Sequence, residues 1–165
     1  MAHPTWQIQA LGFLGWLLLC AVAASVGVIT SARAASFYKQ LLQPAWAPPA
    51  WLFGPMWSVL YILMAVSSWL VWRDHGFTGA ALGLGLFVVQ LVANALWSWL
   101  FFVLRRGALS VAEIVVLWLL ILATILAFWP LHRFAALLLV PYLAWVSVAS
   151  ALTLSLWRAN RAVLG

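Results

Sequence analysis

The side chains best suited to chemistry in this chain are amides and aromatic rings that recur at helical spacing. Gln90 and Asn94 lie four residues apart, and Trp97 and Phe101 follow at steps of three and four. These steps place the four side chains on one face of a helix. Such a face either offers a ligand hydrogen bonds and stacking or holds neighbouring helices together, and the spacing alone favours neither interpretation.

A second group of rings lies in the segment 44–57, which contains three tryptophans and four prolines. Each proline fixes φ near −65° and lacks an N–H, so the segment cannot be one continuous helix. The residue before each proline is also pushed toward extended geometry. We therefore expect a stiff loop, rich in indole rings, that runs into a helix at about Trp51. This loop, about residues 30–50 and here called the lid, is suited to covering a flat apolar ligand at the membrane surface.

A third candidate lies near the end of the chain, where Trp145 and Ala149 share one helical face. A large ring beside a small residue forms a slot for a flat ligand, although ordinary helix packing explains the pair equally well. Pro141 precedes them and is expected to allow a kink, because an internal proline frees a backbone carbonyl.

Other chemistry finds little support. His3, His75 and His132 lie far apart in tails or loops without metal-ligand spacing, so no metal site is expected. Cys20 is the only cysteine, which excludes an intrachain disulfide, and we expect it to be a buried small residue. Glu113, the only acid inside a predicted span, is expected to pair with a neighbouring arginine rather than to relay protons. The sequence contains no hydrolytic triad, phosphate-binding glycine loop or paired catalytic carboxylates.

The composition indicates a membrane protein. Of 165 residues, 68% are hydrophobic and only 6% are charged, whereas a soluble domain has about 25% charged residues. The net charge of +6 does not indicate nucleic-acid binding, because the bases occur one or two at a time between apolar segments. We therefore expect one membrane domain over residues 1–165, with the lipid bilayer as a partner.

The apolar runs are long enough for membrane spans, each of which needs about 20 residues. The five predicted spans are residues 8–29, 51–72, 79–104, 109–129 and 134–157. Short breaks between the last four make consecutive helices antiparallel neighbours. The first span is expected to remain uncleaved, because no Lys or Arg precedes Arg33. The predicted fold class is an all-α membrane protein, a bundle of five transmembrane helices with a long structured loop between the first two.

The distribution of Lys and Arg predicts the orientation. The first loop, the third loop and the C-terminus hold six of these residues, and the N-terminus and the other two loops hold two. The positive-inside rule therefore places the lid and the C-terminus in the cytoplasm and the N-terminus outside. In a bacterium the apolar spans favour the inner membrane over an outer-membrane barrel.

Small residues in the third span predict self-association. Gly79 and Gly83, and likewise Ala81 and Gly85, are separated by four positions. This spacing lets two helices approach closely and often marks a dimer face. We therefore expect a homodimer through the third span.

The chain resembles the TspO/MBR family, also called translocator protein, tryptophan-rich sensory protein or peripheral-type benzodiazepine receptor. The resemblance covers about residues 37–160. The motifs that carry it, in order, are Phe37-Tyr38, the segment 44–57, Gln90-Leu91-x-x-Asn94-x-x-Trp97, Phe101-Phe102, Pro141-Tyr142-Leu143-Ala144-Trp145 and Trp157-Arg158-x-Asn160. It implies a five-helix bundle, usually a homodimer, whose lid folds over a pocket between the helices.

The resemblance also implies ligands: porphyrins such as protoporphyrin IX and haem, and isoquinoline carboxamide or benzodiazepine compounds. No cofactor is required. The ligand contacts that it implies are Tyr38, Trp57, Tyr61, Asn94, Trp97, Trp145 and Ala149. The residue patterns described above add Trp46 and Gln90. Porphyrin carboxylates are expected to meet Arg33, Lys39 or another arginine near the cytoplasmic surface.

Four functions are compatible with these residues. The first is a receptor or sensor linked to tetrapyrrole handling and stress response. The second is a transporter of porphyrins or other amphipathic molecules, and the third is a light- and oxygen-dependent porphyrin-degrading enzyme that uses Trp57 and Trp145. The fourth is a structural or interaction protein whose pocket is vestigial. Many family members have Asn and Tyr where this chain has Thr153 and Leu154. Strong cholesterol binding is therefore not expected, because the short Tyr-containing cholesterol pattern is lost.

Overall fold

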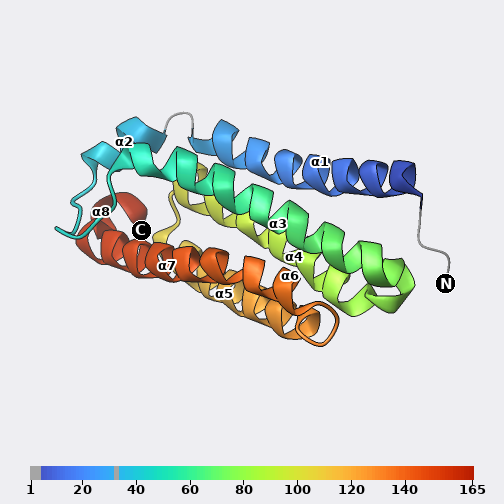
Figure 1. Ribbon diagram of the computed structural model, residues 1–165. Coiled ribbons are helices and arrows are strands. Elements are labelled where there is room, and N and C mark those ends of the chain that lie inside the picture. Colours follow the sequence, from blue (N-terminus) through green and yellow to red (C-terminus); the bar gives the residue numbers. More distant parts are fainter. Residues whose placement is uncertain (1–4, 32–33) are drawn as a thin grey trace.

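The computed structural model describes residues 5–31 and 34–165. These residues form an elongated bundle of antiparallel helices (Figure 1). Five of its segments are long and apolar enough to cross a membrane, which confirms the predicted fold class. The segments are Trp6–Thr30, Ala50–Gly79, Ala81–Val103, Gly107–Phe128 and Arg133–Ala159.

The first half of the chain contains α1 (Trp6–Ser31), the short lid helix α2 (Ala34–Gln40), α3 (Ala50–Gly79), α4 (Ala81–Ser98) and its π-helical continuation η1 (Trp99–Val103). The second half contains α5 (Gly107–Phe128), α6 (Arg133–Leu138), α7 (Val140–Ala159) and α8 (Arg161–Leu164). Figure 1 shows α2, α8 and the C-terminus together at one end of the bundle, here called the lid end, and the start of α1 at the other end.

Prolines determine where two helices begin. Pro49 has extended backbone geometry, with φ −64° and ψ 143°, and α3 starts directly after it. The start agrees with the predicted one to within a residue. The fifth predicted span is interrupted at Leu139, so α6 ends and α7 begins with Pro141 in its first turn. The interruption lies at the position where Pro141 was expected to allow a kink, and a proline in the first turn of a helix loses no hydrogen bond that the helix could have made.

Helix α3 is longer than predicted. The second predicted span ends at residue 72, and the loop expected directly after it is wrong, since Arg73 and Asp74 lie within the last turns of α3. The helical geometry is interrupted at Gly76, which has φ 65° and ψ −176°. Glycine adopts this conformation at little cost because it has no Cβ. The break is therefore a single-residue kink rather than a connecting loop.

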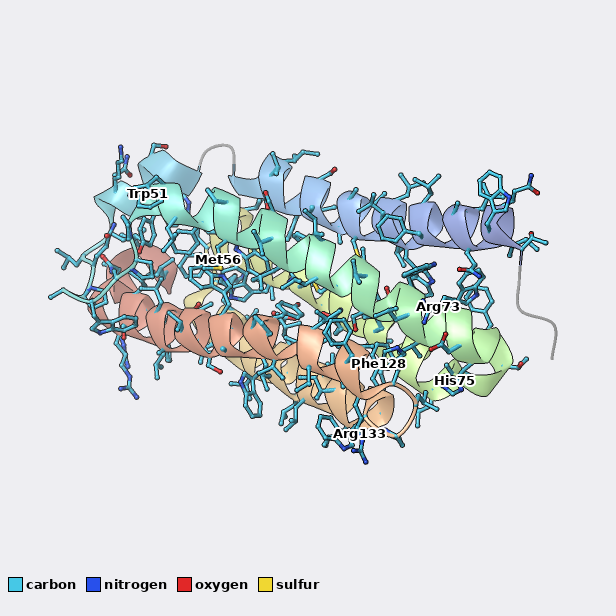
Figure 2. All side chains as sticks on the ribbon, in the orientation of Figure 1. Trp51, Met56, Arg73, His75, Phe128 and Arg133 are labelled. Carbon is cyan, nitrogen blue, oxygen red and sulfur yellow. The ribbon has the colours of Figure 1, made fainter. Side chains whose placement is uncertain are left out.

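At this end of α3, the consecutive polar residues 73–75 meet a histidine that lies far from them in the sequence. Arg73 Nε donates to Asp74 Oδ1 at 2.7 Å, and His132 Nε2 lies 3.5 Å from Asp74 Oδ2. His75 Nε2 lies 3.0 Å from the carbonyl oxygen of Leu131. Figure 2 shows Arg73 and His75 at the end of the bundle opposite Trp51. The expectation that the histidines lie far apart is therefore wrong for His75 and His132, because the turn after α5 folds against α3.

No metal site results from this approach. In the ranges 5–31 and 34–165, no group of three or more His, Cys, Asp or Glu side chains could hold a metal ion. His132 instead caps α6, because its Nδ1 accepts a hydrogen bond from the amide of Ala135 at 3.1 Å. His3 lies outside the described residues.

The expected pairing of Glu113 with an arginine is wrong. Both carboxylate oxygens of Glu113 are buried and have no hydrogen-bond partner among the residues that the structure describes. The nearby bases are directed elsewhere. The Arg105 guanidinium lies over the Phe37 ring of the lid at 4.6 Å, and Arg106 is exposed. Cys20, in contrast, is buried and free, as expected.

The small residues of α4 divide between two environments. Gly83 is buried against α5, and a Cβ built on it would lie 2.9 Å from the Phe128 ring. Gly85 is exposed, and a Cβ there would meet no atom within 4 Å. Gly79 and Ala81 are also exposed. The predicted dimer face is therefore split, since Gly83 packs within the chain while the others remain at its surface.

This division predicts different effects of the same substitution. We expect Gly83→Ala to lower the free energy of unfolding by about 1–3 kcal/mol, because the added methyl group overpacks the contact with Phe128. Gly85→Ala is expected to be neutral or to stabilise by up to about 1 kcal/mol through helix propensity. Thermal unfolding of both variants in the same detergent measures the difference. Equal midpoints would contradict the packing seen at Gly83.

Candidate functional site

A cavity of about 500 Å³ lies between the helices in the half of the bundle nearest the lid. Its lining comes from α1, the lid, α3, α4 with η1, and α7. The size falls within the range of about 300–1,000 Å³ that small-molecule sites occupy. The lining is largely apolar and contains no Asp, Glu, Lys, Arg or His among the described residues.

Aromatic rings form two walls of the cavity. On α3, the rings of Trp57 and Tyr61 lie 5.7 Å apart, one helical turn from each other. On α4 and η1, Trp97 stacks on Phe101 with ring centroids 5.8 Å apart and planes 15° apart. Both pairs follow from the i, i+4 spacing on one helical face. Together they offer a flat ligand several ring faces inside an apolar space.

The lid contributes Tyr38, from α2, to the wall of the cavity. Its hydroxyl donates to the carbonyl oxygen of Pro48 at 3.3 Å, and its ring lies 5.7 Å from Phe53 of α3. Phe53 in turn makes an edge contact with Trp145 at 5.6 Å. Burial raises the pKa of the Tyr38 hydroxyl. The residue therefore remains a neutral hydrogen-bond donor well into the alkaline range.

A directed chain of hydrogen bonds crosses the bundle beside the cavity. Tyr61 Oη donates to Asn94 Oδ1 at 3.1 Å, and Asn94 Nδ2 donates to Tyr142 Oη at 2.7 Å. Tyr142 Oη donates to Gln90 Oε1 at 2.8 Å, and Gln90 Nε2 lies 3.8 Å from Met64 Sδ. The chain joins α3, α4 and α7. In a membrane interior such bonds hold helices together, because an unpaired polar group there is costly.

The two amides that the sequence places on one face therefore have different surroundings. Asn94 lines the cavity and also bridges two tyrosines. Gln90 lies deeper, is 1% exposed and does not line the cavity. Both interpretations of the amide face thus apply, with Asn94 in a position to contact a ligand and Gln90 confined to helix packing.

The structure brings six of the nine predicted ligand residues to the cavity wall. These are Tyr38, Trp57, Tyr61, Asn94, Trp97 and Ala149. The other three are Trp46, Gln90 and Trp145. Trp145 does not line the cavity, but its ring contacts that of Phe53, which does. Trp46 is 51% exposed in the lid.

The sequence prediction missed the contribution of α1. Cys20, Ala24 and Gly27 line the cavity from this helix, and their steps of four and three place them on one face. Small side chains on that face leave the space that the rings of α3 and α4 surround. The spacing of these small residues was the signal available in the sequence. The predicted site did not include them, because it was built from aromatic and polar residues.

Two indole N–H groups near the cavity have no acceptor. The Nε1 atoms of Trp97 and Trp145 are buried and lack a hydrogen-bond partner within the described residues. Trp97 itself lines the cavity. A buried unpaired donor costs about 1–3 kcal/mol. Trp97 is therefore a donor available to a ligand acceptor.

The fold and this site define a class: a multi-pass integral membrane protein with an aromatic cavity between its helices, covered by a lid after the first span. A family comparison agrees with this class, since the TspO/MBR family model matches residues 16–158. The chain belongs to the TspO/MBR family.

Individual relatives extend the match over most of the chain. The chain is 41% identical over 152 residues to Protein CrtK of Rhodobacter capsulatus, which covers 90% of this chain and 92% of that protein. It is 37% identical over 147 residues to Tryptophan-rich protein TspO of Chlorobaculum tepidum, covering 87% and 91%. It is 34% identical over 164 residues to the human Translocator protein, covering 95% and 92%.

Proposed function

We propose that this protein is a membrane receptor or sensor that binds porphyrins, and isoquinoline carboxamide or benzodiazepine-type compounds, in the cavity between its helices. Its role would lie in tetrapyrrole handling and stress response. The observation that carries the proposal is the partly open cavity of about 500 Å³ between the helices, walled by aromatic rings and largely free of polar groups. A flat apolar ring system is the ligand that matches such walls, because it can stack on several indole and phenol faces.

The charge distribution gives such a ligand a direction. The cavity lining has no charged side chain among the described residues, so porphyrin carboxylates are disfavoured inside it. Lys39 and Arg105 lie at the lid end, on α2 and before α5. We expect the macrocycle to lie in the cavity and its carboxylates to reach these bases. Arg33, the other candidate, lies outside the described residues.

Orientation and assembly form part of the same proposal. The lid end carries most of the basic residues, so we assign this end to the cytoplasmic side of the membrane. In a bacterium, we assign the protein as a whole to the inner membrane. The exposed small residues Ala81 and Gly85 on α4 support a homodimer through this helix. The oligomeric state of the Gly85→Ala variant reports on this interface separately from its unfolding midpoint, because the added methyl group meets no atom within one subunit but hinders a dimer that depends on close approach at Gly85.

The test fills the cavity and leaves the rest of the fold unchanged. Gly27 lines the cavity from α1, and a Cβ there would meet nothing within 4 Å. We expect Gly27→Phe to reduce protoporphyrin IX affinity at least about tenfold, because the new ring occupies the ligand's space. Binding is measured in the dark by titration of the detergent-purified protein.

Gly15→Phe is the matched control. Gly15 lies on the same helix, also has open space at its Cβ, and is absent from the cavity wall. It is expected to bind protoporphyrin IX like the unmodified protein. An isoquinoline carboxamide should compete with the porphyrin for the same cavity. Equal affinity of both glycine variants would show that the porphyrin binds elsewhere or enters the micelle, and the proposal would fail.

A further inference from the structure

One side chain of the last span attaches the lid to the bundle. Asn160 Oδ1 accepts a hydrogen bond from the amide of Leu42 at 2.8 Å, and Asn160 Nδ2 donates to the carbonyl oxygen of Leu42 at 3.0 Å. The side-chain amide thus pairs with both backbone groups of one lid residue, as a neighbouring strand would. The two residues lie 118 positions apart in the sequence.

Asn160 is held rigidly where it makes these bonds. It is 8% exposed and ends α7, and its Nδ2 also donates to the carbonyl oxygen of Leu156 at 2.9 Å. The backbone carbonyl oxygen of Asn160 accepts hydrogen bonds from the amides of Val163 at 3.0 Å and Leu164 at 2.9 Å, and these bonds form the first turn of α8. A side chain fixed in this way loses little conformational entropy when it binds the lid, so its hydrogen bonds are preorganised.

Two other hydrogen bonds of the lid act within the lid itself. Gln43 Nε2 donates to the carbonyl oxygen of Tyr38 at 2.6 Å, and Tyr38 Oη donates to that of Pro48. Both bonds join lid residues to each other, so they give the lid a shape. The pair with Asn160 joins the lid to α7. Leu42 follows Tyr38 by four residues, and Tyr38 lines the cavity, so release of Leu42 would loosen the segment that carries this ring.

We propose that Asn160 is a positioning residue that clasps the lid at Leu42, and that the opening of this clasp controls how fast a ligand leaves the cavity. The part about the ligand rests on the proposed function. The clasp itself does not, because it concerns the lid in the ligand-free protein. The chemistry is that of an amide–backbone pair in a largely buried position, where each hydrogen bond is stronger than in water.

The experiment combines hydrogen exchange with ligand release. Asn160→Leu removes both bonds, and Asn160→Asp keeps the acceptor for the Leu42 amide but loses the donor. We expect residues 41–49 to exchange faster in the ligand-free leucine variant, with the aspartate variant between it and the unmodified protein. The dissociation rate of protoporphyrin IX is expected to rise about tenfold in the leucine variant. Ser155→Ala is the control, because its hydroxyl donates only within α7, to Ala151.

Each result decides one part of the proposal. Unchanged exchange of residues 41–49 in Asn160→Leu would overturn the clasp, whatever the protein binds. Faster exchange with an unchanged dissociation rate would overturn the control of release and would indicate that the ligand leaves between the helices. An unmodified protein that binds no porphyrin would refute the proposed function and the control of porphyrin release, while the exchange data would still decide the clasp. A general loss of folding is recognised by faster exchange throughout α3 and α5 as well.

Discussion

Replacing Asn94 with leucine is expected to lower the free energy of unfolding by about 2–4 kcal/mol, one of the two largest effects that the structure predicts. Asn94 accepts a hydrogen bond from Tyr61 and donates one to Tyr142, and all three side chains are buried. Leucine has a similar volume but offers neither group. Tyr142 and Tyr61 each lose a partner on α4, and an unpaired polar group within the bundle is costly.

Thermal unfolding in detergent measures this loss, and a double-mutant cycle assigns it. Tyr142→Phe keeps the ring but leaves Asn94 Nδ2 and Gln90 Oε1 without their partner. If the network acts as a unit, the variant with both substitutions is less destabilised than the sum of the two single variants. Ser155→Ala is a control, because the Ser155 hydroxyl lies outside the network and donates within α7, to the carbonyl oxygen of Ala151. An Asn94→Leu variant as stable as the unmodified protein would contradict the structural role of the network.

Replacing Trp57 with alanine is expected to weaken protoporphyrin IX binding by about tenfold to hundredfold while the fold persists. Trp57 is half-buried and lines the cavity, and its ring lies 5.7 Å from Tyr61 and 6.1 Å from Tyr142. Stacking on an aromatic side chain contributes about 1–3 kcal/mol to binding of a flat ring, and each 1.4 kcal/mol changes affinity about tenfold. The Trp57 ring is only partly buried and lines the cavity, so its removal lowers the stability of the fold less than removal of a core side chain would.

Trp51→Ala is the matched control. Trp51 lies on the same helix, is 72% exposed and does not line the cavity. Binding is measured by titration in the dark, followed by porphyrin absorbance. We expect normal affinity for Trp51→Ala. Trp57→Phe should retain most of the binding, because it keeps an aromatic ring. Equal affinity of the two alanine variants would remove Trp57 from the site. The same samples, illuminated in air, test whether the protein degrades porphyrin and whether Trp57 is needed.

The spans and the start of α3 could be predicted because they depend on neighbouring residues. The thickness of the bilayer determines how long an apolar run must be, and backbone groups in lipid must bond within their own helix. Pro49 ends the lid and begins α3 for an equally local reason, its fixed φ. The i, i+4 aromatic pairs of α3 and η1 are local in the same sense, and six of the nine residues predicted to bind a ligand do line the cavity.

Contacts between distant helices could not be predicted in this way. Gly83 and Gly85 have the same pattern in the sequence, and only the packing of α5 decides that Gly83 lies against Phe128 while Gly85 remains exposed. Glu113 was expected to pair with a neighbouring arginine, but its carboxylate has no partner among the described residues and Arg105 lies over the Phe37 ring instead. Such choices depend on the position of one helix relative to another, which no local pattern specifies.

The sequence by itself therefore determined a five-span helical membrane protein of the TspO/MBR family, with a proline-rich lid and the residues of its aromatic walls. The tertiary structure alone decided that α1 supplies small residues to the cavity, that Asn94 rather than Gln90 reaches it, and that Asn160 holds the lid at Leu42. The physical reason is range. Hydropathy and backbone geometry act between residues a few positions apart, whereas a cavity and a clasp are formed by side chains that meet only after the helices have packed.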